Sequence, residues 1–385
     1  MRVLEVLGSS GGGVIRHVRS LAAGLADAGD DVVVAGPGRQ LDDLSSSPPD
    51  RSGAGHPITV EDVPIADRPR PGQDLRAVRS LRRLSADRDL VHAHGLRAGA
   101  LAVLAVRSRR RRDRRPRLAV TLHNLPVGGG LVAAVSGVLE RVVARGADVV
   151  LGVSPDLVDR ARSRGARRVV LALVPAPVSE GDSAPSSATP GATRSRRAAV
   201  RAELAVADGD ALVVAVARLA PQKGLDLLTD VLALLKDRPA TLGRVRAVIA
   251  GDGPLRSRLE SEVAARGLPL RLLGHRDDVP SLFAAADVVV LTSVWEGQSL
   301  AVQEALRAGA ALVATDVGGT RAVTGDGAAL VPRTDPATTA GAFAAEVGAL
   351  LDDPQKLRDL RQRAAQRARA LPTEADAVRQ IRALG

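Results

Sequence analysis

The segment 287–320 constrains the fold most, because it carries a strand, a polar turn, a helix and a second strand in one uninterrupted run. It opens on the apolar run Val288–Leu291, which is typical of a strand buried on both faces of a parallel sheet. After the polar turn, apolar residues recur at helical spacing from Leu300 to Ala308, and Gly309 ends this helix. The run Ala311–Ala314 begins the next strand. This order of elements predicts an α/β domain with a parallel sheet.

Two glutamates frame the turn and the helix of this segment. Glu296 lies at the turn, and Glu304 lies inside the helix, with seven residues between them. We interpret Ser299 as the N-cap of the helix, whose unpaired N–H groups and dipole suit a phosphate. Carboxylates accept hydrogen bonds from sugar hydroxyls, so the arrangement indicates a nucleotide-sugar site. The spacing alone also fits glutamates on an exposed helix, but open α/β sheets bind ligands at the carboxyl ends of strands.

The same alternation of strands and helices extends along the chain. In the first half we expect strands at 2–7, 31–36, 90–93, 118–122 and 149–153, and helices at 14–28, 74–85, 96–106 and 131–145. In the second half we expect strands at 211–217, 245–250, 270–273, 288–291, 311–314 and 328–331, and helices at 225–235, 255–266, 336–351, 354–370 and 374–384. Each half therefore predicts a doubly wound parallel sheet.

The stretch 175–195 separates these halves, because it is rich in Pro, Ser, Ala and Gly and shows no periodicity. We therefore predict a domain at 1–174, a linker at 175–195, a second domain at 196–370 and a C-terminal helix within 371–385. The sequence has no signal peptide and no apolar stretch long enough to span a membrane, so we expect a soluble, cytoplasmic protein.

Glycines and histidines mark the ends of predicted strands in the first half. The glycine loop 8–13 follows the first strand and lets a backbone approach a phosphate or a sugar closely. It is not a dinucleotide-binding fingerprint, because no acidic residue follows the second strand. His92, His94 and His123 lie at the ends of later strands. They are either polar residues hydrogen-bonded at strand ends or one wall of a polar cleft.

Composition narrows the chemistry. The absence of cysteine excludes disulfides, thiolate metal sites and a cysteine nucleophile, and six scattered histidines argue against a structural zinc site. Only three of the 54 basic residues are lysines, so Lys223 stands out against the arginine background. It follows the predicted strand 211–217 together with Arg218. We expect this pair to neutralise the charge that grows on a diphosphate leaving group without a metal.

The tract Arg107–Arg117 contains eight arginines between a predicted helix and a predicted strand. Three interpretations are open, of which solvated loop charge is the default because arginine is abundant throughout the chain. The second is peripheral contact with the anionic inner face of the cell membrane, which would serve a lipid acceptor. Nucleic acid is the least favoured partner, because aromatic residues that could stack on bases make up only 1% of the chain.

Taken together, these features resemble the retaining glycosyltransferases of the GT-B fold, in the family numbered 4 of the sequence-based classification. The matching pieces run nearly end to end and comprise SGGGVIRHVRSLAAGLADAGDDV, VHAHG, TLHN, VSPDL, ARLAPQKGLDLL, AGDGPLRSRLE, LGHRDDVPSLFAAADVVVLTS and WEGQSLAVQEALRAGAALVATDVGG. The resemblance implies two Rossmann-like domains facing across a cleft, the first for the acceptor and the second for the nucleotide sugar. It also implies that the final helix crosses back to the first domain.

The resemblance also implies roles for individual residues. Arg218 and Lys223 would hold the diphosphate. Glu296 would bind hydroxyls of the donor sugar, Glu304 would bind the ribose, and His123 would approach the reacting sugar from the N-terminal domain. The other residues implied in donor binding are Gly12, Gly13, Gly251, Gly253, His275, Arg276, Gly297, Gln298, Ser299 and Leu300. No metal and no cofactor are expected, since the nucleotide sugar is a substrate.

Two departures from the family pattern leave the donor sugar open. The sequence Glu296-Gly297-Gln298-Ser299 stands where the family usually has E-G-F-G, and Thr320-Arg321 stands where it usually has proline and glutamate. We predict retaining transfer of a glycosyl group from a UDP- or GDP-sugar to a hydroxyl acceptor. The alternatives are a nucleotide-sugar epimerase or hydrolase of the same fold and a non-catalytic nucleotide-sugar-binding protein.

Overall fold

The computed structural model describes residues 1–9, 12–38, 41, 57–109, 115–125, 129–177, 190–236 and 245–385. They form two compact units: unit 1 consists of Met1–Pro177 with Pro372–Gly385, and unit 2 consists of Val178–Leu371. Within the described residues, no helix combines the length and the apolar character needed to cross a membrane.

Unit 1 is built on a parallel sheet with the strand order β3-β2-β1-β4-β5-β6-β7. The strands are β1 (Arg2–Leu7), β2 (Asp31–Gly36), β3 (Thr59–Asp62), β4 (Leu90–His94), β5 (Arg117–Leu122), β6 (Val149–Gly152) and β7 (Val169–Leu171). The chain adds strands first on one side of β1 and then on the other, so the order reverses between β1 and β4. In open α/β sheets this reversal marks the edge where ligands bind.

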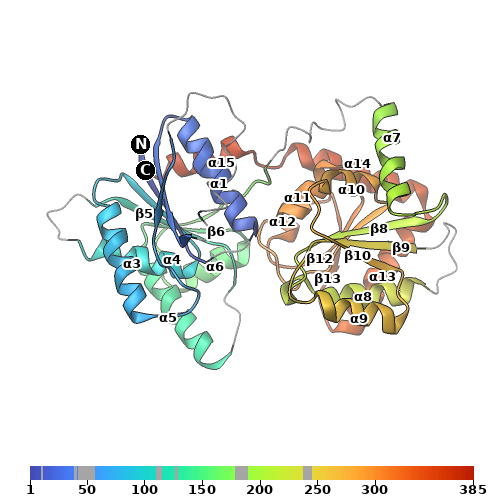
Figure 1. Ribbon diagram of the computed structural model, residues 1–385, viewed down its shortest axis with the longest axis horizontal. Coiled ribbons are helices and arrows are strands. Elements are labelled where there is room, and N and C mark those ends of the chain that lie inside the picture. The colour runs from blue at the N-terminus through green and yellow to red at the C-terminus, as the bar shows by residue number, and fades with distance from the viewer. Residues whose placement is uncertain are drawn as a thin grey trace. The chain divides into compact units, whose positions relative to one another are not determined.

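Helices cover both faces of the unit 1 sheet. They are α1 (Gly12–Asp27), α3 (Pro71–Leu84), α4 (Leu96–Arg107), α5 (Gly130–Gly146), α6 (Pro155–Ser163) and α15 (Glu374–Arg382). Helices α1 and α15 pack together on one face, and α3, α4 and α5 lie side by side on the other (Figure 1). The buried face of α1 carries Val18, Leu21 and Leu25 at helical spacing, which fixes how this helix is oriented on the sheet.

The C-terminal helix α15 belongs to unit 1 although it follows unit 2 in the chain. It begins with a capping box in which Thr373 and Asp376 satisfy each other's backbone N–H groups. A Cβ atom on Gly24 of α1 would lie 2.6 Å from the Val378 side chain, so this glycine allows the two helices to approach closely. The Arg382 guanidinium pairs with the buried Asp30 at 3.2 Å.

Unit 2 repeats the architecture with the strand order β10-β9-β8-β11-β12-β13. The strands are β8 (Ala211–Val216), β9 (Val245–Ala250), β10 (Leu270–Gly274), β11 (Val288–Leu291), β12 (Leu312–Asp316) and β13 (Ala329–Pro332). The helices are α7 (Pro190–Glu203), the short 3-10 helix η2 (Pro221–Lys223), α8 (Leu225–Lys236), α9 (Arg256–Arg266), α10 (Val279–Ala285), α11 (Leu300–Arg307), α12 (Thr320–Thr324), α13 (Pro336–Asp352) and α14 (Pro354–Arg369).

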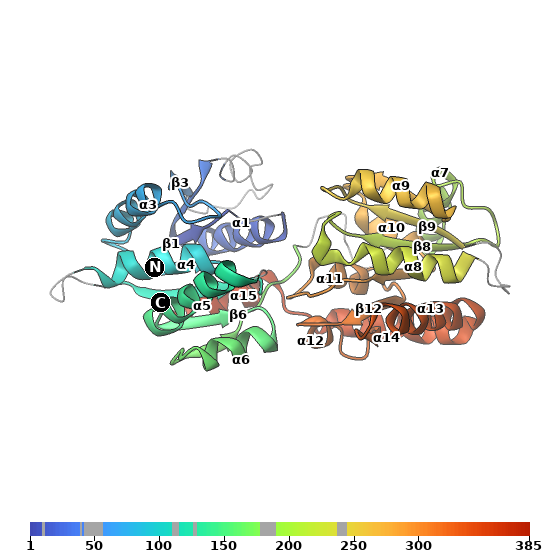
Figure 2. The same ribbon diagram turned by 90° about the horizontal axis from the view of Figure 1, so that it is seen from below.

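Alternation along the unit 2 strands creates two cores. Val213 and Val290 face a core with the residues of α8 and α13, and Phe343 lies fully buried there. Leu212 and Val289 point to the opposite face, where α10, α11 and α14 cover them. Figure 1 and Figure 2 show α8, α9 and α13 on one side of the sheet and α10, α11 and α14 on the other. Both faces are therefore apolar, and polar groups concentrate at the strand ends.

The predicted fold class is confirmed, since both units are doubly wound parallel α/β domains. Several elements were not predicted, namely β3, β7, α6, α7, α10 and α12. Helix α7 begins at Pro190, so the last part of the predicted linker 175–195 is helical, whereas residues 178–189 lie outside the described residues.

Candidate functional site

Glu296 and Lys223 meet at the carboxyl edge of the unit 2 sheet, in the segments that follow the neighbouring strands β11 and β8. Lys223 Nζ donates to Glu296 Oε1 at 2.6 Å, and Ser293 Oγ donates to the same oxygen at 2.5 Å. The Glu296 residue is 7% exposed, and the Lys223 side chain is 23% exposed. The sequence predicted both residues as site residues, and the structure brings them into direct contact.

Glycine backbone geometry holds Lys223 beside β11. Gly224 ends η2 with a φ of 57°, and a Cβ atom there would lie 2.2 Å from the Thr292 carbonyl oxygen. A side chain at this position would therefore force the two segments apart. The Thr292 hydroxyl donates to the Lys223 carbonyl at 3.2 Å, and the Val294 N–H donates to the Gln222 carbonyl at 2.8 Å. These contacts fix the start of the Lys223 side chain.

The other side of Glu296 is held by the segment after β12. Gly318 has a φ of 55°, and a Cβ atom on it would lie 2.1 Å from the Glu296 carbonyl oxygen. The Gly319 N–H donates to that carbonyl at 2.9 Å. The Thr315 hydroxyl donates to the Ser293 carbonyl at 2.7 Å. The turn that carries Glu296 is thus fixed from both neighbouring strand ends.

Arg218 is exposed and follows β8, and two predicted glycines position the backbone around it. A Cβ atom on Gly251 would lie 2.0 Å from the Ala217 carbonyl oxygen, and one on Gly253 would lie 2.5 Å from the Leu219 carbonyl oxygen. These glycines therefore let the turn after β9 pack directly against the backbone on both sides of Arg218. In the structure, Gly251 and Gly253 contact the residues on either side of Arg218, and through them they position the backbone of Arg218.

The N-terminus of α11 follows the Glu296 turn. Ser299 occupies the N-cap position, but its side chain makes no capping hydrogen bond, and Leu300 is the first helical residue. Gly297 and Gln298, which complete the turn, are half-buried. Glu304 lies one turn into α11 and is also half-buried. The predicted order of turn, helix start and second glutamate is therefore present along one continuous segment.

His275 and Arg276 follow β10, which is separated from β8 by β9 in the sheet. The His275 side chain is highly exposed and contacts Asp277 at 3.1 Å. Arg276 pairs with Glu203 of α7 at 2.6 Å and with Asp278 at 2.7 Å. The hydrogen bonds that its guanidinium donates to Asp278 and Glu203 raise the pKa of Arg276, so this cation stays charged at the end of β10.

In unit 1, Gly12 and Gly13 are the exposed first residues of α1. Among the described residues, and apart from its neighbours in the chain, no atom lies within 4 Å of where a Cβ atom on Gly12 would be. The preceding residues 10–11, which belong to the predicted glycine loop, lie outside the described residues.

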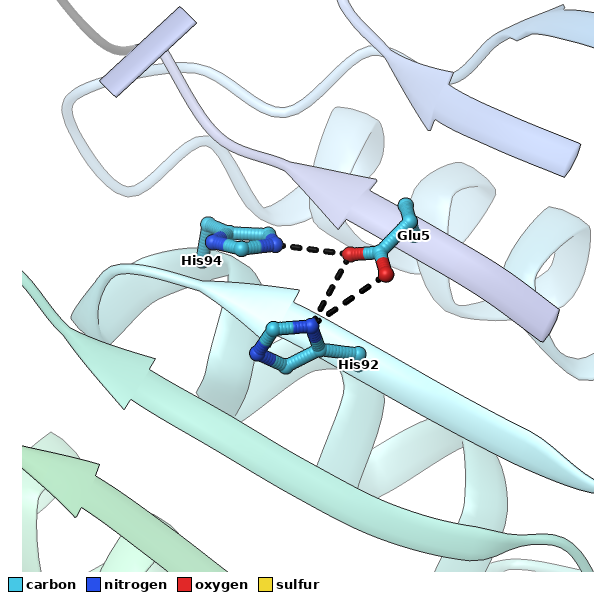
Figure 3. A group of neighbouring side chains, drawn as sticks. All are labelled: Glu5, His92 and His94. Atoms are coloured by element: carbon cyan, nitrogen blue, oxygen red, sulfur yellow. Dashed lines mark hydrogen bonds and ion pairs between the residues drawn. The ribbon is translucent and has the colours of Figure 1, made fainter. Parts of the chain in front are cut away.

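A buried glutamate joins the two histidines of β4 (Figure 3). Glu5 lies directly opposite His92 in the register of β1 and β4, and His94 lies two residues further on the same face. His94 Nε2 lies 2.7 Å from Glu5 Oε2, and His92 Nδ1 lies 3.0 Å from the same oxygen. All three side chains are inaccessible, so the β4 histidines form no wall of an open cleft.

His123, which follows β5, extends this cluster. Its Nε2 lies 3.0 Å from His94 Nδ1, and the two rings stack with their centroids 5.3 Å apart. His92 Nε2 contacts the Thr121 hydroxyl at 2.8 Å. From α1, the His17 ring lies with its centroid 6.0 Å from His94 and 5.9 Å from His123. His123 is 9% exposed, whereas His92 and His94 of β4 are at most 1% exposed.

Burial sets the protonation of these groups. It lowers the pKa of His94 to about 4, with repulsion from His92 acting in the same direction and Glu5 opposing both. Burial and repulsion from His94 and His92 lower the pKa of His17 to about 3. Burial, followed by the repulsion that protonated His94, His17 and His92 would exert, holds the pKa of His123 well below its usual value. Burial would raise the pKa of Glu5, but His92 and His94 lower it to about 2.

Glu5, His92 and His94 also offer three donor atoms within 4.8 Å of one another, a set that could hold a metal ion. The distances favour hydrogen bonds. Metal bonds of about 2.1 Å at a tetrahedral angle would separate two donor atoms by about 3.4 Å. His94 Nε2 and Glu5 Oε2 are only 2.7 Å apart, which is the length of a charge-assisted hydrogen bond.

The described ends of the arginine tract are engaged within unit 1. Arg107 pairs with Asp148 at 2.6 Å, and Arg109 donates to the Arg82 carbonyl at 3.1 Å. Arg117 donates to the Leu384 carbonyl at 3.2 Å. Residues 110–114, which contain half of the arginines in the tract, lie outside the described residues.

Family models match both halves of the chain. The model described as "Glycosyl transferase 4-like domain" matches residues 12–177, and the model described as "Glycosyl transferases group 1" matches residues 196–369. The chain belongs to the family 4 glycosyltransferases. The two matches cover the two units in the order that the sequence predicted.

Curated relatives match parts of the chain. An alpha-D-kanosaminyltransferase from Streptomyces kanamyceticus is 34% identical over 47% of this chain and 45% of its own length. A D-inositol 3-phosphate glycosyltransferase from Nocardia farcinica is 36% identical over 44% of this chain and 39% of its own length. The matched region thus spans less than half the length of these relatives.

Solved structures share the fold over the whole chain. The Anabaena protein Alr3699/HepE, in complex with UDP, superposes with a TM-score of 0.78 at 22% identity, covering 100% of this chain and 99% of that one. WaaG, a glycosyltransferase involved in lipopolysaccharide biosynthesis, has a TM-score of 0.73 at 15% identity, with 100% and 99% covered. At these identities the likeness establishes the GT-B fold.

Three residues that contact the predicted site residues were not identified from the sequence. Glu5 is the one charged residue inside the run 3–7, and a lone charge in a buried strand indicates a paired group. Ser293 lies three residues before Glu296, and no local pattern distinguishes it. His17 lies on the same face of α1 as Leu21. A polar residue on an apolar helical face is the pattern that could have identified it.

Proposed function

We propose that this protein is a retaining glycosyltransferase that moves a sugar from a UDP- or GDP-sugar to a hydroxyl group of an acceptor. The observation that carries the proposal is the contact between Lys223 and Glu296 at the carboxyl edge of the unit 2 sheet. It joins a cation that can hold a diphosphate to a carboxylate that can accept hydrogen bonds from sugar hydroxyls. Both residues lie within the segment matched by the group 1 glycosyltransferase model.

Lys223 would stabilise the leaving group. An ammonium group has three donors, and only one of them is needed for Glu296, so the others can reach a diphosphate. Negative charge grows on the diphosphate as its bond to the sugar breaks, and a fixed cation stabilises that charge. Arg218, at the end of β8, would add a second cation. We therefore propose a reaction that proceeds without a divalent metal.

Glu296 and Glu304 would divide the recognition of the donor between them. Glu296 would accept hydrogen bonds from hydroxyls of the transferred sugar, and Glu304 would accept them from the ribose. The first N–H groups of α11 lie between these glutamates along the chain and suit the diphosphate. In unit 1, His123 would contact the reacting sugar.

Relatives support a nucleotide-sugar donor without selecting the base. A GDP-mannose-dependent alpha-mannosyltransferase from Mycobacterium tuberculosis is 37% identical over 30% of this chain and 28% of its own length. The Anabaena protein was solved with UDP and with UDP-glucose. Uridine and guanosine nucleotides are therefore both included in the binding screen.

A thermal-shift screen with UDP, GDP and their common sugars tests nucleotide binding first. A ligand at 100 times its dissociation constant adds about 2.7 kcal/mol of stability. With the best donor, nucleotide release is then measured with and without a panel of hydroxyl acceptors, and the anomeric configuration of the product is read by NMR. Transfer requires that nucleotide release depends on the acceptor. A metal-independent reaction requires that this release persists in EDTA. Release without any acceptor would identify a hydrolase, and no stabilisation by any nucleotide would contradict the proposal.

A further inference from the structure

A continuous chain of short contacts runs from Glu5 through His94 to His123. Glu5 and His94 point toward each other from the adjacent strands β1 and β4 (Figure 3). Glu5 Oε2 lies 2.7 Å from His94 Nε2, and His94 Nδ1 lies 3.0 Å from His123 Nε2. Both distances lie in the range of hydrogen bonds, so each contact needs one donor and one acceptor.

The proton positions along this chain follow from that requirement. An ionised carboxylate only accepts, so His94 carries its proton on Nε2 and donates to Glu5. A neutral His94 then has a bare Nδ1, which can only accept. His123 Nε2 must therefore carry the proton of that ring, and Nδ1 of a neutral His123 is left as an acceptor. The lowered pKa values of Glu5, His94 and His123 agree with one ionised carboxylate and neutral rings at neutral pH.

We propose that Glu5 and His94 are positioning residues that fix the tautomer of His123, so that His123 presents Nδ1 as a hydrogen-bond acceptor to a hydroxyl of the substrate. This inference rests on the proposed function, because only there does His123 contact the sugar. His92 assists by donating its Nδ1 proton to the same Glu5 carboxylate, which keeps Glu5 ionised.

The fixed tautomer has a consequence for recognition. An acceptor nitrogen binds a hydroxyl, which can donate, and disfavours a phosphate oxygen, whose lone pairs would face the nitrogen lone pair. His123 is therefore matched to a sugar or acceptor hydroxyl, and the diphosphate is left to cations elsewhere. Inverting the tautomer would turn Nδ1 into a donor and reverse this preference.

The tautomer can be read directly in the unmodified protein. In the full chain labelled with 15N at histidine, ring correlations by NMR distinguish a protonated from a bare ring nitrogen, and the chain has only six histidines to assign. The expected result at pH 7 is a neutral His123 with the proton on Nε2. A proton on Nδ1, or a cationic ring, would overturn the proposal. This readout needs no substrate, so it fails or succeeds independently of the proposed function.

Two substitutions of His94 separate positioning from packing. Asparagine places an amide oxygen near the position of Nδ1 and can still accept from His123, whereas glutamine places its amide near Nε2 and still meets Glu5. We expect His94→Asn to keep the His123 tautomer and transfer rates within about 3-fold. His94→Gln should lose the tautomer and lower kcat/KM by about 10- to 100-fold, as for a substrate hydrogen bond replaced by a mismatched one.

A matched control is Glu140→Gln, because Glu140 is also a buried carboxylate of unit 1 and pairs with Arg160 and Arg164. It should leave the His123 spectrum and kcat/KM unchanged, whereas Glu5→Gln should mix the two tautomers, since its amide can donate to His94. Equal losses in His94→Asn and His94→Gln, or an unchanged His123 tautomer in Glu5→Gln, would mean that the cluster only supports the fold. If the wild-type protein transfers no sugar, the NMR result still decides the tautomer.

Discussion

Replacing Glu296 with alanine should abolish most turnover while sparing nucleotide binding and folding. The substitution removes one acceptor shared by Lys223 Nζ and Ser293 Oγ. Because the Lys223 side chain is 23% exposed and can turn to water, we expect a loss of about 1–2 kcal/mol of folding free energy. For a unit of this size, that lowers Tm by roughly 2–8 °C.

The expected loss of rate is much larger. Removing one group that stabilises the transition state typically costs about 10²–10³ in kcat. A protein with about 5–15 kcal/mol of stability remains almost entirely folded after losing 1–2 kcal/mol, so unfolding accounts for none of this loss. The nucleotide should bind as before, since Glu296 is proposed to touch the sugar and Lys223 the phosphates.

The assay compares kcat for transfer with the Kd for UDP or GDP, measured by calorimetry on the same preparations. The control is Glu346→Ala, which also removes the carboxylate of a Glu–Lys pair, here with Lys356 at 2.9 Å between α13 and α14. It should leave both quantities unchanged. If Glu296→Ala kept its kcat, or if nucleotide affinity fell as much as the rate, the proposed role of Glu296 would be refuted.

The remaining predictions concern both units. Lys223→Ala should lower kcat by about 10²–10³ and donor affinity much less, because charge on the diphosphate grows in the transition state; an unchanged rate at saturating donor would exclude this role. Glu304→Ala should instead weaken nucleotide affinity in calorimetry, and unaltered affinity would contradict ribose binding. Urea midpoints should fall between about pH 6.5 and pH 3, because the unfolded chain binds protons at His17 and His94 that the folded unit binds only below their lowered pKa values. The dependence of the urea midpoint on pH should be weaker in His94→Asn. A midpoint that does not change with pH would refute the conclusion that these histidine rings are buried and neutral. If the tract Arg107–Arg117 contacts membranes, the protein should sediment with anionic vesicles at low salt and dissociate in about 0.5 M salt; no sedimentation at low salt would rule this contact out.

Periodicity was sufficient to predict the fold because parallel strands buried on both faces form short apolar runs. The predicted strands at 31–36, 245–250 and 288–291 agree with β2, β9 and β11 residue for residue. The unpredicted β7 has only three residues, Val169–Leu171, and lies on a sheet edge, so it leaves too short a pattern. Helix α7 was hidden because its Pro-Gly-Ala start continues the linker composition.

The site was predicted as separate residues, and their contacts were not. Lys223 and Glu296 are 73 residues apart in the chain, so their contact depends on the adjacency of β8 and β11. The glycines that permit the contact have ordinary sequence neighbours. Gly224 and Gly318 matter only because a carbonyl oxygen lies where their Cβ atom would be.

The contact of Glu5 with His92 and His94 could not be predicted from the sequence. The spacing of His92 and His94 places both on one face of a strand, but it does not reveal which residue of the neighbouring strand lies opposite. The parallel register of β1 and β4 pairs Glu5 with His92, and a shift by one residue would turn the carboxylate to the other face. That register pairs residues 87 positions apart in the chain, so no local pattern encodes it.

The two units use one device for different chemistry. In each, a carboxylate with little or no exposed surface holds the proton of a partner: Glu5 fixes the proton of His94, and Glu296 pairs with the ammonium of Lys223. Lys223 retains a positive charge and two further donors, which suits a diphosphate. His94 is neutral and passes its orientation to His123, which is left with an acceptor and suits a hydroxyl. On the proposed function, the buried carboxylate beside each group thus sets its chemistry: a cation for a diphosphate at Lys223 and an acceptor nitrogen for a hydroxyl at His123.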